Sequence, residues 1–337
     1  MKKIVSFVLS LAFAGSTFAQ MSGYSSSSYS EGTALGSNET LTADGIALGN
    51  AVKLRGYIDT RLSHIDIDGD STKNPTDITA TADMDFLVDL SPITAEVHLN
   101  LAESNKSGCG AELLEQAFGR YSFNQDLHLT FGRQETVLGY EGDEPTDLHA
   151  VTRAFSNGAH SYSSRDYVDG VRLNYNNGLF GLVFGIHDSY GIDNNTTLDD
   201  GMAIDLAASI MFFPGLEAQI GFVNENGKTD DDTQIVNGWV EWNPGDLTLA
   251  IEFNSLSLHD NTDAFDLMLL ANYQFSDFFA ATIRYALMDH ESVESNRITL
   301  AALLSVTDNF GLNFEYSHTA QDNADKDEFY VQGLITY

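Results

Sequence analysis

Hydrophobic and polar residues alternate along most of this chain with a period of two. In one early segment Leu54, Ile58 and Leu62 occupy even positions, whereas the odd positions between them carry residues such as Arg55 and Asp59. Successive side chains of a β-strand point to opposite faces, so each such segment has one apolar and one polar face. The spacing that an amphipathic helix would need is poorly matched throughout. The pattern predicts an all-β chain.

Short and long connections take turns between these segments. About sixteen strands of roughly 9–13 residues fit between them, which suits a tilted crossing of the bilayer hydrocarbon. Tight turns on one rim and long loops on the other are typical of outer-membrane barrels. We therefore predict a transmembrane antiparallel up-and-down β-barrel of about 16 strands, with long outer loops and short periplasmic turns. The short connections are residues 90–92, 124–125, 176–178, 213–215, 243–246, 276–277 and 307–308, and the long ones are 66–77, 104–111, 136–165, 190–200, 226–232, 258–262, 290–293 and 319–326.

Aromatic residues near the segment ends support a membrane barrel over a secreted β-sandwich or propeller, the two alternatives for an all-β chain. Phe123, Phe213, Trp242 and Phe275 lie beside short turns, where they would form girdles at the membrane interfaces. Closure of the barrel also leaves no unpaired strand edge, which lipid would not tolerate.

The first nineteen residues have the features of a secretory signal peptide. Lys2 and Lys3 form a short basic start, residues 4–14 are mostly apolar, and the small residues that follow lead to a cleavage site after Ala19. Residues 20–50 contain a Ser/Gly-rich stretch and are expected to form a flexible N-terminal arm. We therefore expect three parts: a signal peptide at 1–19, the arm at 20–50, and the outer-membrane barrel at 51–337.

Composition excludes several function classes. The chain has 337 residues, and its 49 acidic and 16 basic residues give a net charge of −33. Nucleic acid is not an expected partner, because phosphate binding needs clustered Lys and Arg. A single cysteine excludes an internal disulfide and a cysteine-based zinc site. The acidity agrees with a preference for cations, and equally with a saline habitat.

Residues 115–187 and the C-terminal segment carry a resemblance to a known family. The sequence resembles the putative β-barrel porin-2 family of bacterial outer-membrane proteins. This resemblance implies that the third outer loop, residues 136–165, folds inward as the constriction. It also implies that the last strand, ending at Tyr337, is recognised by the barrel-assembly machinery, and that the chain forms homotrimers. The stretches that carry it are EQAFGRY (115–121), LTFGRQE (129–135), LGYEG (138–142), RAF (153–155), YVDGVRL (167–173) and the alternating residues 329–337.

A barrel of about 16 strands is wide enough for an aqueous channel, and strand parity predicts its lining. Acidic and basic groups opposed across a narrow pore would create a transverse field that sorts ions. We expect the acidic first half of loop 136–165 to face arginines of the barrel wall. The candidate pore-lining residues are Arg55, Arg61, Arg120 and Arg172 on the wall, and Glu135, Glu141, Asp143, Glu144 and Asp147 at the loop.

Metal and catalytic chemistry are not expected. Acidic residues at 66–77 have partial EF-hand spacing, but Ser71 stands where a calcium loop needs glycine. The sequence contains no Gly-x-Ser-x-Gly motif, and its nine histidines are scattered. We therefore assign no catalytic residue, no metal ligand and no cofactor.

These observations predict a porin of the cell outer membrane, in contact with lipid and lipopolysaccharide. It would pass small hydrophilic solutes or ions by passive diffusion and prefer cations. Two alternatives stay open: a structural or adhesive barrel without an open channel, and a barrel-embedded hydrolase.

Overall fold

The structure is a computed structural model and describes most of the predicted barrel. The predicted signal peptide at 1–19 and residues 20–34 of the predicted arm lie outside the described residues. None of the described helical segments has the length and hydrophobicity of a transmembrane helix. The described residues are 35–38, 40, 44–68, 75–101, 114–154, 167–190, 198, 201–226, 232–257, 263–290, 293–321 and 325–337.

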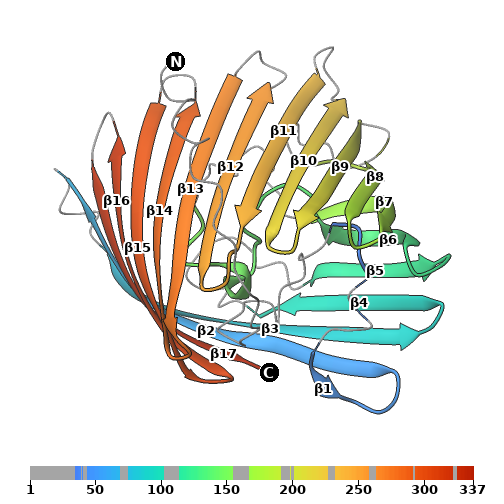
Figure 1. Ribbon diagram of the computed structural model, residues 1–337, viewed down its shortest axis with the longest axis horizontal. Helices are drawn as coiled ribbons and strands as arrows, with labels where there is room; N and C mark the ends of the chain where they lie inside the picture. Colours follow the sequence, from blue (N-terminus) through green and yellow to red (C-terminus); the bar gives the residue numbers. More distant parts are fainter. Residues whose placement is uncertain are drawn as a thin grey trace.

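Sixteen antiparallel strands, β2 to β17, form one closed barrel (Figure 1). Each strand pairs with the next one in the sequence, and β17 pairs with β2 to close the sheet. A two-residue strand, β1 (Ile46–Ala47), pairs with the start of β2. The barrel strands are β2 (Val52–Ile67), β3 (Thr76–Leu90), β4 (Ile93–Asn100), β5 (Leu114–Ser122), β6 (Leu127–Glu135), β7 (Tyr167–Asn176), β8 (Phe180–His187), β9 (Met202–Phe213), β10 (Leu216–Asn226), β11 (Asp232–Trp242), β12 (Leu247–Ser257), β13 (Asp263–Ser276), β14 (Phe279–His290), β15 (Val293–Thr307), β16 (Phe310–Gln321) and β17 (Lys326–Thr336).

Most connections alternate between short and long, as the sequence predicts. The exception is the connection predicted to be long at 290–293, where only two residues separate β14 from β15. Only Ser91 and Pro92 separate β3 from β4, and only Pro214 and Gly215 separate β9 from β10. The next connection in each case is a long loop, so tight turns gather at one rim and long loops at the other. The predicted fold class, an antiparallel up-and-down barrel of about 16 strands, is confirmed.

Neighbouring residues of one strand separate cleanly into outward and inward positions. In β12, Ile251 is 43% exposed and Glu252 is 2% exposed; in β14, Ile283 is 54% exposed and Arg284 is 1% exposed. Apolar residues on the outside are stable only when lipid covers them, whereas charged residues inside can be satisfied by each other and by water. The alternation is therefore that of a barrel that spans a membrane.

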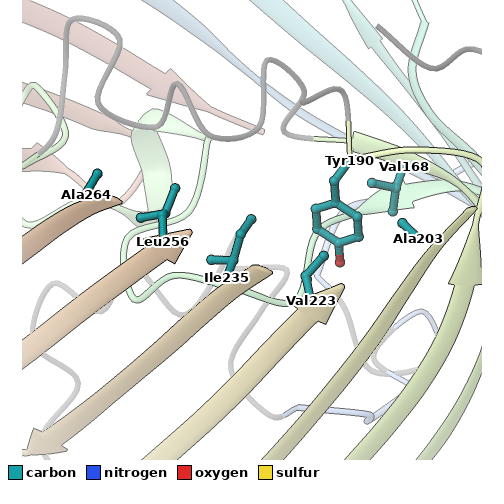
Figure 2. Packing of buried hydrophobic residues seen from close by; sticks show 7 residues of the cluster. All are labelled: Val168, Tyr190, Ala203, Val223, Ile235, Leu256 and Ala264. Atoms are coloured by element: carbon teal, nitrogen blue, oxygen red, sulfur yellow. The ribbon is translucent and has the colours of Figure 1, made fainter. Parts of the chain in front are cut away.

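The inner face also carries an apolar cluster near the long-loop rim (Figure 2). It brings together residues from β7 and from β9 to β13 with Tyr190, which follows β8. Leu138 from the β6–β7 loop packs against the cluster. The start of the β6–β7 loop therefore packs against the wall, and the lumen is apolar at this place. The buried members are Val168, Tyr190, Ala203, Val223, Ile235, Leu256 and Ala264.

The barrel wall is uneven in height. Strands β4 to β8 have 8–10 residues each, whereas β13 has 14 and β15 has 15. The low side of the barrel is therefore the continuous arc from β4 to β8 (Figure 1).

Candidate functional site

The described part of the β6–β7 loop, residues 136–154, folds into the barrel; we call it the inward loop. The backbone N–H of Gly139 donates to Asn237 Oδ1 of β11 at 3.2 Å, and the hydroxyl of Tyr140 donates to Glu241 Oε2 of the same strand at 2.7 Å. Farther along, the hydroxyl of Thr282 in β14 donates to the carbonyl oxygen of His149. The inward loop therefore crosses the lumen from β6 to the wall formed by β11 to β16.

A buried ion pair fixes the inward loop to the far wall. Arg284 Nη1 lies 2.5 Å from Glu141 Oε1, and the two side chains are 1% and 4% exposed. The same guanidinium donates to the carbonyl of Thr152 at 2.6 Å, while Glu141 Oε2 accepts the backbone N–H of Ala154 at 2.6 Å. Glu141 and Arg284 therefore join the two ends of the inward loop to each other and to β14.

Glu315 of β16 forms a second attachment point. Its Oε2 accepts the backbone N–H groups of Val151 and Thr152 at 2.7 and 2.9 Å, and its Oε1 accepts the Thr152 hydroxyl at 2.5 Å. Arg297 Nη2 lies 3.7 Å from Glu315 and 3.2 Å from Glu328. Hydrogen bonds to a charged acceptor are stronger than neutral ones, so this carboxylate holds the backbone of the inward loop firmly.

Two side chains of the inward loop remain neutral near pH 7. Burial and the neighbouring Glu241 carboxylate raise the pKa of Tyr140 well above its usual range, so Tyr140 keeps its proton as a hydrogen-bond donor. Burial lowers the pKa of His149 below 6.5, although Glu241 and Glu141 act in the opposite direction. Tyr140 therefore adds no negative charge and His149 no positive charge to the lumen at neutral pH.

A cavity of about 410 Å³, which we call the larger cavity, lies between the inward loop and the wall. Both charge signs line it, as the sequence analysis expects of a constriction. Asn174 and Gln219 contribute neutral polar groups. The predicted site residues around this cavity are Arg55, Arg120, Arg172, Glu135, Glu141 and Asp147.

A smaller cavity of about 210 Å³ contains the other three predicted residues, Arg61, Asp143 and Glu144. Asp59 and Glu115 also line it, so four carboxylates and one arginine surround this space. The structure thus places all nine predicted residues around two cavities beside the inward loop, and their role in conduction stays a prediction.

Carboxylates of loop and wall come unexpectedly close together at the smaller cavity. Oxygens of Asp83, Glu115 and Glu144 lie within 4.8 Å of one another, and all three residues are buried. Asp83 and Glu115 belong to β3 and β5, whereas Glu144 belongs to the inward loop. This cluster brings three carboxyl groups together where the inward loop meets β3 and β5.

Glu141 and Asp143 line the same cavities as the predicted wall arginines but form their direct ion pairs with other residues. Glu141 pairs with Arg284, and Asp143 pairs with Arg153 of its own loop at 3.0 Å. Tyr167 also donates to Asp143 at 3.1 Å.

The physical reason is that each predicted wall arginine has an acidic partner on the wall itself. These partners lie on the same strand or on strands one or two positions away, so the pairs form without ordering a loop. Arg55 and Asp85, for example, are directly opposed in the β2–β3 register. The pairs are Arg55–Asp85 at 3.1 Å, Arg61–Asp59 at 2.6 Å, Arg120–Glu96 at 3.5 Å and Arg172–Asp205 at 2.8 Å.

Sequence reasoning missed the residues that position the inward loop. Arg284, Arg297 and Glu315 lie on polar faces that strand parity assigns to the lumen, but parity does not distinguish an anchor from a solvated charge. It also missed Asn38 and Thr40, which precede the barrel and contact its inner wall. The sequence feature that could have indicated this contact is a polar residue close to a glycine, Asn38 near Gly36, but the composition of the segment indicates a linker instead.

A closed 16-stranded barrel with an apolar outer face, a charged lumen and a loop folded into it defines an outer-membrane porin channel. Residues 74–330 match the family described as putative beta-barrel porin-2, OmpL-like, and the chain belongs to this family. The resemblance expected from the sequence is thereby confirmed. No curated protein matches the sequence.

Solved porin structures share the fold at low sequence identity. An anion-selective porin from Comamonas acidovorans has a TM-score of 0.64 and 13% identity over 85% of this chain and 99% of its own. OmpF of Salmonella typhi, in complex with daunomycin, has a TM-score of 0.64 and 14% identity over 85% of this chain and 98% of its own. A trimer form of the outer-membrane protein OmpT of Vibrio cholerae has a TM-score of 0.58 and 14% identity over 86% of this chain and 100% of its own. The TM-scores establish a common fold, and at identities this low the comparison with these structures shows the fold alone.

Proposed function

We propose that this porin passes small hydrophilic solutes and ions by passive diffusion and prefers cations. The solutes would move through the water-filled space beside the inward loop, under the field of the charged groups that line both cavities. The channel requires no cofactor, and we assign it no catalytic residue.

The acidic surroundings of the smaller cavity carry the proposed cation preference. Among the described residues, its charged lining consists of Arg61 and the four acidic residues Asp59, Glu115, Asp143 and Glu144. Arg61 lies 2.6 Å from Asp59 and Arg153 lies 3.0 Å from Asp143, so four acidic groups face two basic groups around this space. A ring of carboxylates with low-dielectric walls raises the local concentration of cations and repels anions.

The test is the reversal potential of the channel in a planar bilayer under a salt gradient. The double variant Asp143→Asn, Glu144→Gln removes two negative charges of the inward loop and leaves the Glu141 anchor intact. We expect the permeability ratio of cation to anion to fall severalfold. A matched control, Asp277→Asn with Asp308→Asn, removes the same charge from exposed short turns and should leave the ratio unchanged.

Two results would contradict the proposal. Equal selectivity in the wild type and the loop variant would remove Asp143 and Glu144 from the ion path. Folded protein that admits no sugar or amino acid in a liposome-swelling assay would favour the structural barrel without an open channel.

We further propose that the barrel assembles as a homotrimer through its low wall. Strands β4 and β8 have 8 residues each, below the roughly 9–11 that a tilted strand needs to cross the hydrocarbon. Apolar residues on this side, including Phe131, Leu182 and Phe184, are 44–50% exposed. Contact with neighbouring subunits would cover these residues and relieve the mismatch with lipid. Cross-linking in native membranes should give a trimer band, and a barrel that is only monomeric would exclude this arrangement.

We also propose how the protein is exported and inserted into the outer membrane. Signal peptidase would cleave after Ala19, and the assembly machinery would recognise the C-terminal strand β17. The mature barrel would then lie in the outer membrane, in contact with lipid and lipopolysaccharide. The mass of the mature N-terminus tests the cleavage site.

A further inference from the structure

Residues that precede the barrel lie against the inner face of its low wall. We call the described residues 35–38 and 40 the N-terminal segment. The carbonyl of Leu35 accepts a hydrogen bond from Asn176 Nδ2 at 2.8 Å, and Asn38 Nδ2 donates to Ser122 Oγ at 3.3 Å. Asn176 and Ser122 are the last residues of β7 and β5, so the segment crosses the low wall at its short-turn rim.

The N-terminal segment contacts the charged groups of the larger cavity. Arg120 Nη1 donates to Asn38 Oδ1 at 2.8 Å and to Thr40 Oγ1 at 3.0 Å. The Thr40 hydroxyl in turn donates to Glu96 Oε1, and Thr40 is only 3% exposed. Leu35, Gly36, Ser37 and Thr40 line the 410 Å³ cavity together with Arg120 and Glu96. The segment is thus part of the cavity wall.

Two glycines allow this close approach of backbones. Gly36 has φ of +76°, and a Cβ atom there would lie 2.8 Å from the carbonyl oxygen of Tyr175. On the barrel side, a Cβ atom at Gly181 would lie 2.4 Å from the carbonyl oxygen of Leu35. Contacts this short are forbidden, so any side chain at position 181 would displace the segment.

We infer that the N-terminal segment forms part of the channel constriction, narrowing the lumen at the low wall and setting its charge selectivity by holding Arg120. The inference rests on the proposed channel function. Asn38 and Thr40 accept hydrogen bonds from Nη1 of Arg120, which also lies 3.5 Å from Glu96 Oε1. Without the segment this ion pair would be open to the cavity, and anions would reach the guanidinium more easily. The segment therefore supports cation preference by occupying the lumen beside this guanidinium and binding it.

Deletion of residues 20–42, with the signal peptide retained, tests the inference in the full barrel. The single-channel conductance should rise about twofold, because the constriction widens, and the reversal potential should shift toward anions. A shorter deletion of residues 20–30 keeps the segment and should leave both quantities unchanged. Heat-modifiable migration on a gel verifies that each variant forms a barrel. Wild-type conductance and selectivity after the longer deletion would overturn the inference.

Gly181→Ala displaces the segment without removing it. The variant should raise the conductance of the full chain but leave the conductance of the 20–42 deletion unchanged. An equal effect in both backgrounds would mean that the substitution acts on the wall alone, since its Cβ would also lie 2.6 Å from Ser209 Oγ. That result would contradict the inference that the N-terminal segment narrows the channel.

A cysteine pair locates the segment independently of conduction. Asn38→Cys with Ser122→Cys, in a Cys109→Ser background that removes the chain's one native cysteine, should form a disulfide in the folded barrel. Peptide mapping with and without reductant detects it. A disulfide in a barrel that does not conduct would refute the proposed function and leave the segment in place. A conducting barrel without the disulfide would refute the inference alone.

Discussion

Neutralising Glu141 should release the inward loop from the barrel wall. Its carboxylate pairs with Arg284 Nη1 at 2.5 Å and accepts the Ala154 backbone N–H at 2.6 Å. Both members of the ion pair are almost fully buried, so the substitution Glu141→Gln leaves the guanidinium without its charged partner. The inward loop then loses one of its attachments to β14, while the hydrogen bonds from Thr282 to His149 and from Arg284 to Thr152 remain.

The magnitude follows from the burial of the pair. Removal of one partner of a buried ion pair costs about 3–5 kcal/mol, because the remaining charge is uncompensated. Arg284 keeps its hydrogen bond to the carbonyl of Thr152, so we take the lower end, about 3 kcal/mol. Since about 1.4 kcal/mol corresponds to a factor of ten, the ratio of docked to released loop should fall roughly 100-fold.

Amide hydrogen exchange measures this equilibrium directly. The N–H groups of Val151 and Thr152 donate to Glu315, not to Glu141, so they report the docking of the loop rather than the loss of one bond. Their protection should fall about 100-fold in the Glu141→Gln variant, in line with the change in the docking equilibrium. Glu294→Gln, an exposed substitution of the same chemistry in β15, is the control and should change nothing.

The double variant Glu141→Leu, Arg284→Met decides whether the ion pair is responsible. Replacement of both buried charges by apolar residues is often nearly neutral, so protection should return to within about tenfold of the wild type. Unchanged protection in Glu141→Gln would refute the anchoring role. Simple addition of the two single effects would show that the residues act separately.

Three further predictions concern the wall and the inward loop. Ile283→Arg places a charge on the lipid face of β14 and should lower the free energy of unfolding by about 2–4 kcal/mol in a urea titration in bilayers, whereas an unchanged value would contradict the inside-outside assignment. Glu315→Gln weakens the charge-assisted bonds to Val151 and Thr152 and should speed exchange of both amides by an amount equivalent to about 2 kcal/mol; exchange at the wild-type rate would dismiss this attachment. Because burial lowers the pKa of His149 below 6.5 in the docked loop, the released loop binds a proton more readily, and docking should weaken as the pH falls through about 6.5. His149→Asn should flatten this dependence of Val151 exchange on pH, and an identical slope in both proteins would show that another group titrates.

The strand order and the inside-outside pattern could be predicted from the sequence because lipid and water impose opposite demands on alternate residues. Ile283 and Arg284 show the principle: one residue of shift would expose the charge to lipid, so the pattern is tightly constrained. The positions of the turns follow for the same reason, since each tight turn must return the chain to the opposite rim.

Contacts between the inward loop and the wall could not be predicted in this way. Glu141 and Arg284 are 143 positions apart, and Val151 and Glu315 are 164 apart. Strand parity assigns the wall residues to the lumen but does not determine which strand the loop reaches. The predicted arginines were plausible partners by charge alone, yet Asp85 and Asp205 neutralise Arg55 and Arg172 on the wall.

The N-terminal segment shows a different limit of sequence reasoning. A Ser/Gly-rich composition indicates a flexible linker, and the same glycines permit close packing of backbones. Gly36 of the arm serves this second purpose together with Gly181 of β8, and only their positions in space reveal it.

Single-channel recording of the refolded wild-type protein in a planar bilayer, under a salt gradient, tests the central claim most directly. An open porin predicts discrete conductance steps and a reversal potential on the cation-selective side. A protein whose barrel resists unfolding on a gel but gives no steps would contradict the channel function and leave only the fold.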